Sequence, residues 1–216
     1  PSVVYFESDS NVVVGQVAKD STEMEPEKTV AFVKRHIGKG DGFSFNYNGD
    51  ELKPEAISAF VLRKLAKDAE SQTGEKVENV VITHPAYFGQ NEIQATKDAG
   101  TIAGLNVVAL MPEPVAAAYA YGLSSPENYG KTILVYDLGG TFDATLVKID
   151  EKEIRVITTG GDANLGGYNW DERLIDLIVD KICDQTSADR DELMEDPETR
   201  ALLQNKAETI KIALSN

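Results

Sequence analysis

The stretch Ile133-Leu-Val-Tyr-Asp-Leu-Gly-Gly-Thr-Phe-Asp-Ala-Thr-Leu-Val-Lys-Ile149 places two apolar runs on either side of an acid, a glycine pair, a threonine and a second acid. Both runs are rich in β-branched and aromatic residues, so each favours a strand, and the short glycine-containing segment between them favours a hairpin. Gly139 and Gly140 lack Cβ atoms at the turn, which allows successive amide N–H groups to point at an anion. The pattern predicts a β-hairpin that binds phosphate.

The two acids of this hairpin, Asp137 and Asp143, lie on either side of the turn. Carboxylates in these positions would hold the hydrated Mg²⁺ that accompanies a nucleotide phosphate. A plain hairpin, in which the Asp and Thr side chains serve only the geometry of the turn, explains the same eight residues. Both interpretations stay open at this point.

Composition excludes several classes of protein. The chain has 216 residues, of which 42% are hydrophobic, and no apolar run of about 18 residues, so we expect a globular protein without a membrane partner. Its 36 acidic and 21 basic residues give a net charge of −15, which argues against a nucleic-acid partner. The single cysteine, Cys183, is typical of a reducing compartment, so we expect a cytoplasmic location.

Strand-like and helix-like segments alternate along the chain, which predicts an α/β fold with a sheet covered by helices. Besides the hairpin, we expect strands at residues 3–6, 12–15, 77–83, 107–110 and 154–159. We expect helices at residues 28–37, 54–73, 91–103, 113–121, 168–184 and 197–214. The inner face of the last helix is expected to carry Leu202, Leu203, Ile210 and Leu214.

Four motifs follow one another along the chain: Ile82-Thr-His-Pro-Ala-Tyr-Phe88, Pro112-Glu-Pro-Val-Ala-Ala-Ala-Tyr-Ala-Tyr-Gly-Leu123, Asp137-Leu-Gly-Gly-Thr-Phe-Asp143 and Gly161-Asp-Ala-Asn-Leu-Gly-Gly167. In order and spacing they resemble the ATPase (nucleotide-binding) domain of the Hsp70 chaperones, most closely the bacterial DnaK type. Each motif is a weak signal by itself, but together with matching segments at both ends they cover nearly the whole chain.

The resemblance implies the actin-like ATPase fold, which is ribonuclease H-like and has two lobes that clasp a nucleotide. Residues 1–129 match most of lobe I without its first strand and first phosphate loop, and residues 130–216 match the first part of lobe II. The chain therefore resembles the middle of this domain. We expect it to bind ATP weakly or not at all by itself, and not to hydrolyse it, because phosphoryl transfer depends on positioning from both lobes.

The resemblance also implies catalytic and metal-binding roles. Lys34 matches the lysine that contacts the γ-phosphate region and positions the attacking water. Glu113 matches the glutamate near that water and the Mg²⁺ shell. Asp137 matches the acid closest to the water and metal, and Asp143 matches the acid on the other side of the metal. Without the resemblance, Lys34 would be a surface lysine and Glu113 an acid that stabilises the start of a helix.

Cofactor contacts follow from the resemblance in two places. The second phosphate loop is matched by Gly139, Gly140 and Thr141, and the adenosine contacts by Glu208, Lys211 and Ser215. The last three residues are spaced to share one face of a helix, where they would otherwise form an ordinary solvated stripe.

The function implied by the resemblance is that of a Mg²⁺-dependent ATPase, binding ATP and ADP, in a chaperone of protein folding and the stress response. Its partners would be unfolded client peptides, bound through a separate domain, a J-domain co-chaperone and a nucleotide-exchange factor. Two alternatives stay open. One is a nucleotide-binding pseudo-ATPase scaffold; the other is a different actin-like ATPase, such as a filament protein or sugar kinase, against which the motifs around Pro85 and Glu113 speak.

Three departures from the family pattern are visible. The phosphate loop has two glycines where the family usually has three, which favours the scaffold. Pro112-Glu-Pro-Val115 replaces Asn-Glu-Pro-Thr. His84 replaces a valine before Pro85, which matches a proline thought to relay the nucleotide state to the substrate domain. A histidine there could make the relay pH-sensitive, but we favour a partly exposed residue at a strand end.

Overall fold

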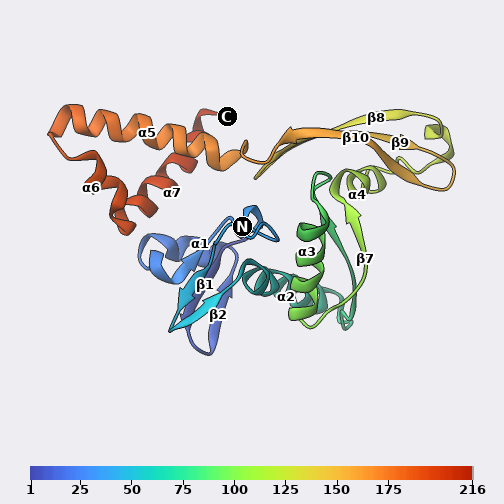
Figure 1. The fold of residues 1–216 in the computed structure, drawn as a ribbon, viewed down its shortest axis with the longest axis horizontal. Coiled ribbons are helices and arrows are strands. Elements are labelled where there is room, and N and C mark those ends of the chain that lie inside the picture. The colour runs from blue at the N-terminus through green and yellow to red at the C-terminus, as the bar shows by residue number, and fades with distance from the viewer. Residues whose placement is uncertain (216) are drawn as a thin grey trace. The chain divides into compact units, whose positions relative to one another are not determined.

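The computed structural model describes residues 1–215, which fall into two compact units. One unit combines Pro1–Ala31 with the C-terminal segment that starts at Asn164, and the other consists of Phe32–Ala163 (Figure 1). The organisation is mixed α/β, as predicted from the alternation of strand and helix patterns. The assignment of residues 1–129 and 130–216 to two lobes stays a prediction.

The predicted hairpin forms in the second unit. Strands β8 (Thr132–Leu138) and β9 (Phe142–Ile149) pair antiparallel, and β10 (Ile154–Asp162) pairs with the other edge of β9. Helix α4 (Glu113–Ala120) covers one face of this sheet (Figure 1). Their shared core consists of Val115, Ala118, Val147, Ile149 and Ile154. Burial of this apolar surface stabilises the base from which the hairpin turn projects.

A second sheet of this unit contains the parallel pair β6 (Asn79–His84) and β7 (Asn106–Pro112). Helix α3 (Gln90–Ile102) forms the crossover between them, as parallel strands require. A Cβ atom on Gly100 would collide with side-chain atoms of Val107 and Ile82, so α3 approaches the strands closely at this glycine. Helix α2 (Pro54–Thr73) packs on α3, and its bounds are those predicted.

The first unit has an antiparallel sheet of β1 (Val4–Ser8), β2 (Asn11–Val14) and β3 (Thr29–Val30), with β1 in the centre. Helix α1 (Gln16–Asp20) and two 3₁₀ turns, η1 (Ser21–Glu23) and η2 (Pro26–Lys28), connect β2 to β3.

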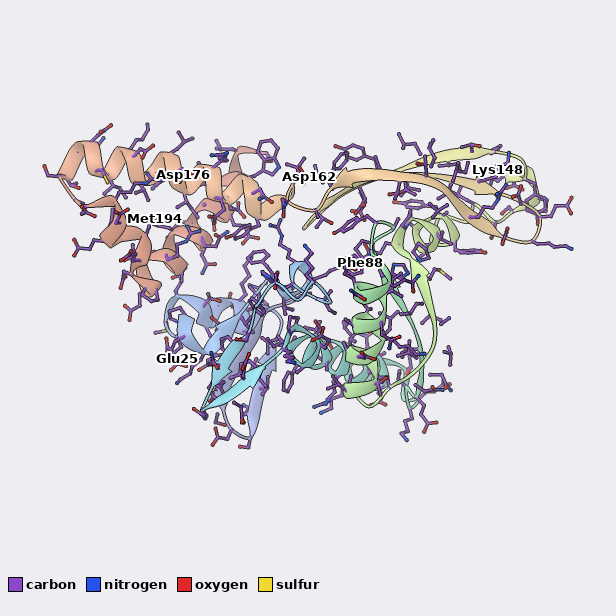
Figure 2. All side chains as sticks on the ribbon, viewed as in Figure 1. Glu25, Phe88, Lys148, Asp162, Asp176 and Met194 are labelled. Carbon is purple, nitrogen blue, oxygen red and sulfur yellow. The ribbon has the colours of Figure 1, made fainter. Side chains whose placement is uncertain are left out.

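Three helices complete this first unit: α5 (Gly167–Thr186), α6 (Arg190–Glu195) and α7 (Pro197–Leu214). The two long helices bury Ile175 and Val179 against Leu203 and Ala207. Figure 2 labels Asp176 on α5 and Met194 on α6; Asp176 accepts a hydrogen bond of 2.6 Å from Arg190, and Met194 packs on the core. The expected inner face of α7 was only partly correct, because Leu203 is buried whereas Leu214 is 80% exposed.

The helix predicted at residues 28–37 was wrong. Thr29 and Val30 form β3 and pair with β1, and Phe32 has a positive φ of 57°, which a helix does not tolerate. Only the 3₁₀ turn η3 (Val33–Arg35) remains of the predicted helix.

The hairpin of β4 (Phe45–Tyr47) and β5 (Asp50–Leu52) was not predicted. Its Asn48-Gly49 turn, in which both residues have positive φ, is a known hairpin signal. The short helix α6, capped by the Asp189 side chain, was also missed. Another 3₁₀ turn, η4 (Pro126–Asn128), precedes β8.

Candidate active site

The parallel strands β6 and β7 end side by side, with His84 paired to Pro112. Pro85 follows the first strand, and Glu113 opens α4 directly after the second. Ligands of α/β proteins commonly bind at the carboxyl ends of parallel strands, where loops and helix N-termini provide polar groups. The structure therefore places the Pro85 and Glu113 motifs at one end of this sheet.

Lys34 and Glu113, which are 79 residues apart in the sequence, form an ion pair in the second unit. The Lys34 Nζ atom lies 2.6 Å from Glu113 Oε1. The Lys34 side chain is 59% exposed, so this pair contributes little to stability and leaves the ammonium group accessible. The structure thus brings together two residues that the sequence predicted as catalytic.

Asp137 and Asp143 are direct partners across the β8–β9 hairpin. Asp143 is only 6% exposed, and its Oδ1 atom is buried without a hydrogen-bond partner. Burial raises the pKa of Asp143, the negative charges of Glu113 and Asp137 raise this pKa further, and the Lys34 charge and a hydrogen bond to Thr141 oppose the rise. A carboxyl group in this setting is stabilised by a proton or by a bound cation.

Tyr87 and Thr141 extend this acidic cluster. Thr141 lowers the pKa of both Tyr87 and Asp143, so the motif after β6 approaches the hairpin at this residue. Burial raises the pKa of Tyr87, and the charges of Asp143 and Glu113 add to the rise. Sequence reasoning did not assign a role to Tyr87, although the residue belongs to a motif that carried the resemblance.

Arg35 is the second site residue that sequence reasoning missed. Its Nη2 atom donates a hydrogen bond of 2.6 Å to the Gly140 carbonyl, across 105 residues of sequence. The Gly139 N–H donates to the Thr141 carbonyl at 3.0 Å, so this amide is used within the turn. The amides of Gly140 and Thr141 are therefore the ones available to face an anion. The signal in the sequence was the position of Arg35 directly after Lys34.

A third acid, Asp162, lies at the turn end of the β8–β10 sheet. Figure 2 labels Asp162 at the end of β10 beside the hairpin turn, where it pairs with Phe142, and Lys148 at the far end of the sheet. The neighbouring Gly161 is the partner of Asp143. Asp137, Asp143 and Asp162 thus lie at the end of the sheet that carries the glycine turn.

Asp137 and Asp143 fit a hydrated Mg²⁺, because this ion is commonly bound through one or two carboxylates with several waters. The buried, unsatisfied Oδ1 of Asp143 supports that fit. Throughout residues 1–215, no group of three or more His, Cys, Asp or Glu side chains is arranged to hold a metal. Water and phosphate oxygens would therefore have to complete the coordination.

The predicted adenosine contacts lie on α7 and at its C-cap, Ser215, in the first unit, and each already has a partner within the chain. Glu208 pairs with Lys19. Lys211 Nζ lies 2.7 Å from Oδ1 of the buried Asp171 and 3.2 Å from the Gly167 carbonyl. Ser215 donates its hydroxyl hydrogen to the Lys211 carbonyl at 2.9 Å.

His84 differs from the sequence-based expectation. It is buried, with 7% of its surface exposed, so the interpretation as a partly exposed residue was wrong. Its Nδ1 atom lies 2.9 Å from the Pro85 carbonyl oxygen, and its ring is stacked against the Phe88 ring with centroids 6.3 Å apart. The turn after β6 folds over the end of that strand and covers the imidazole.

Acids that converge beside a glycine-containing turn, with a lysine and an arginine close by, are typical of proteins that bind a metal ion together with phosphate. The family model described as Hsp70 protein matches residues 1–41 and 39–216, and the chain belongs to the Hsp70 family. Members of this family are ATP-binding chaperone ATPases with an actin-like fold, and the small sheets seen here are consistent with part of that fold. No helix among the described residues is both long and apolar enough to cross a bilayer.

Proposed function

We propose that these residues form the catalytic part of the nucleotide-binding domain of a DnaK-like Hsp70 and take part in Mg²⁺-dependent ATP hydrolysis. One observation carries this proposal. Lys34, Glu113, Asp137 and Asp143, which lie far apart in the sequence, all contribute to one electrostatic cluster within the second unit. Convergence of this kind supports a shared task in phosphoryl transfer.

The residues divide that task as follows. Asp137 and Asp143 would hold a hydrated Mg²⁺, which would neutralise charge on the phosphate oxygens. Lys34 stabilises the charge that develops on the transferred phosphoryl group and orients the attacking water, and Glu113 holds the Lys34 ammonium in place. Arg35 fixes the turn through the Gly140 carbonyl, so that the free amides of the turn keep their direction.

Adenosine binding is assigned to the face of α7 that carries Glu208, Lys211 and Ser215. Glu208 and Lys211 lie on one face of this helix, and Ser215, its C-cap, continues that face. Because Glu208 and Lys211 pair with Lys19 and Asp171, a nucleotide has to exchange with or add to these contacts. The site proposed here therefore adapts when adenosine binds.

The partners and setting follow from this assignment. The chain would act in the cytoplasm on unfolded client peptides, held by a separate domain, during stress and ordinary folding. A J-domain co-chaperone would stimulate hydrolysis, and a nucleotide-exchange factor would release ADP. The acidic net charge of −15 favours basic partner surfaces.

The second candidate function is a nucleotide-binding scaffold of the same family without useful turnover. The observation that favours it is the two-glycine turn, in which the Gly139 N–H bonds within the turn and is lost as a phosphate ligand. A turn with fewer amides facing the phosphate would bind nucleotide but stabilise the transition state poorly.

The two functions are separated by calorimetric ATP titration and single-turnover hydrolysis in the full-length protein. We expect Mg²⁺-dependent binding and hydrolysis in the wild type and a loss of both Mg²⁺ dependence and hydrolysis in Asp137→Asn. The matched control is Asp68→Asn, which removes an exposed acid of α2 that pairs with Lys64 at 2.5 Å. Tight binding without turnover in the wild type would support the scaffold, and absence of binding would contradict both functions.

A further inference from the structure

Directly after Lys34 and Arg35, three residues contact one another: His36, Asp41 and Phe43. His36 Nδ1 lies 2.8 Å from Asp41 Oδ2, and the imidazole stacks on the Phe43 ring with centroids 4.2 Å apart and planes 15° apart. The Phe43 N–H donates a 3.1 Å hydrogen bond to the other oxygen of Asp41. These two bonds lower the pKa of Asp41, the one to His36 having the larger effect, so the carboxylate stays charged. We call His36, Asp41 and Phe43 the clip.

The residues that follow His36 are anchored on α2 and α3. Ile37 is buried in the core with Phe88, Ala95 and Ala99. Gly38 has a φ of 68°, and a Cβ atom there would lie 2.5 Å from the Glu92 Cα atom, so only glycine fits. Its N–H donates to Glu55 Oε1 at 3.4 Å. Beyond His36, the chain therefore has a fixed support.

The residues before His36 are the ones that reach the candidate active site. Lys34 pairs with Glu113, and Arg35 binds the Gly140 carbonyl. The His36 N–H closes the η3 turn by donating to the Val33 carbonyl at 3.0 Å, and the His36 carbonyl accepts from Lys39 at 3.2 Å. The η3 turn begins at the buried Val33, and His36 links its other end, which carries both cations, to the buried Ile37.

We propose that His36 is a positioning residue, which acts through the clip to hold the η3 turn and so fixes Lys34 and Arg35 in the geometry needed for ATP hydrolysis. The inference rests on the proposed ATPase function and deepens it. His36 itself contacts neither Lys34 nor Glu113 through the bonds described above, so its effect is indirect. A misplacement of catalytic groups by about 1 Å can lower a rate by up to about a hundredfold, so a loosened turn has a measurable cost.

The test uses single-turnover hydrolysis and nucleotide affinity in the full-length protein. We expect His36→Leu to lower the single-turnover rate by about tenfold while the affinity for ATP changes by less than about threefold, because positioning acts on the chemical step. Asp41→Ala should have the same effect, and the double variant should lose no more than either single one. His36→Asn keeps an N–H donor near the position of Nδ1 and should restore most of the rate. Asp68→Asn on α2 is the control for a lost surface ion pair.

A second measurement is independent of catalysis. Hydrogen exchange of the Arg35 amide, which donates to the Phe32 carbonyl at 3.0 Å, should become faster in His36→Leu and return toward wild type in His36→Asn. Unchanged exchange overturns the proposal even if the protein proves not to be an ATPase. Unchanged hydrolysis in His36→Leu, in an active wild type, overturns it as well. Absence of hydrolysis in the wild type contradicts the proposed function. Hydrogen exchange of the Arg35 amide then decides whether the clip holds the η3 turn.

Discussion

Two regions carry the predicted ligand contacts, and they handle charge differently. In the β8–β9 region, the acids outnumber the cations that act on Asp143. Between α5, α7 and the N-terminal segment, acids and bases instead form one-to-one pairs, which are Lys19–Glu208, Lys211–Asp171 and Arg200–Glu172. An uncompensated acidic cluster is what a cation site requires, whereas a paired network stabilises the fold until a ligand exchanges with it.

The largest expected effect is on the rate of ATP hydrolysis and comes from the lysine that faces the acidic cluster. Lys34→Ala in the full-length protein should lower the single-turnover rate by about 10²- to 10³-fold, the range found when one preorganised charge-stabilising donor is removed. Nucleotide affinity should stay largely intact, because the lysine acts mainly on charge that develops during transfer. Lys64→Ala, which removes an exposed lysine of α2, is the control. A wild-type rate in Lys34→Ala would show that the catalytic assignment is wrong.

In the ion-paired region of α5 and α7, we expect substitutions to change the free energy of unfolding. Asp171→Asn removes the buried partner of Lys211, and we expect it to lower the free energy of unfolding by about 2 kcal/mol, less than for a fully buried pair because Lys211 is partly exposed. Urea denaturation measures this loss, and Asp176→Asn at the exposed edge of α5 provides a comparison. If Asp171→Asn is neutral, the network does not stabilise the fold and the contrast between the two regions fails.

The length of the glycine turn between β8 and β9 tests whether this turn supports full ATPase activity. Inserting a glycine after Gly140 restores the usual length of the family loop, and we expect kcat to rise about tenfold, which corresponds to about 1.4 kcal/mol of recovered transition-state stabilisation. Steady-state kinetics of the full-length protein give this number. An unchanged or lower kcat would mean that the short turn, held by Arg35, is already competent, and would favour the chaperone ATPase over the scaffold.

The smallest effect concerns pH. Because the fold raises the pKa of Asp143, its protonated form stabilises the fold below the usual aspartate pKa, and this contribution is lost as the pH rises through the raised value. Asp143→Asn should therefore unfold at a higher temperature than the wild type at neutral pH without Mg²⁺, and the difference should shrink toward acid pH. Thermal melts between pH 4 and 8 follow this trend. A lower melting temperature at neutral pH would show that the ionised carboxylate does not cost stability.

Local patterns predicted the elements well and the contacts between them poorly. The hairpin and α2 follow from strand-type alternation and helix periodicity, both of which are local. The helix expected at residues 28–37 was wrong because pairing of Val30 with Val4 overrides local preference. The role of Arg35 could not be predicted, since its partner Gly140 is brought near only by the fold. The burial of His84 likewise depends on the turn that follows it.

The bond between Arg35 and Gly140 has a consequence for how the protein matures. It joins residues 105 positions apart, and the Lys34–Glu113 pair spans 79 positions, so each requires a large loop of chain to be closed. Contacts of such high sequence separation form slowly, because the entropy of closing the chain is lost before they stabilise it. We therefore expect the proposed catalytic geometry to form late in folding, after the local helices and hairpins.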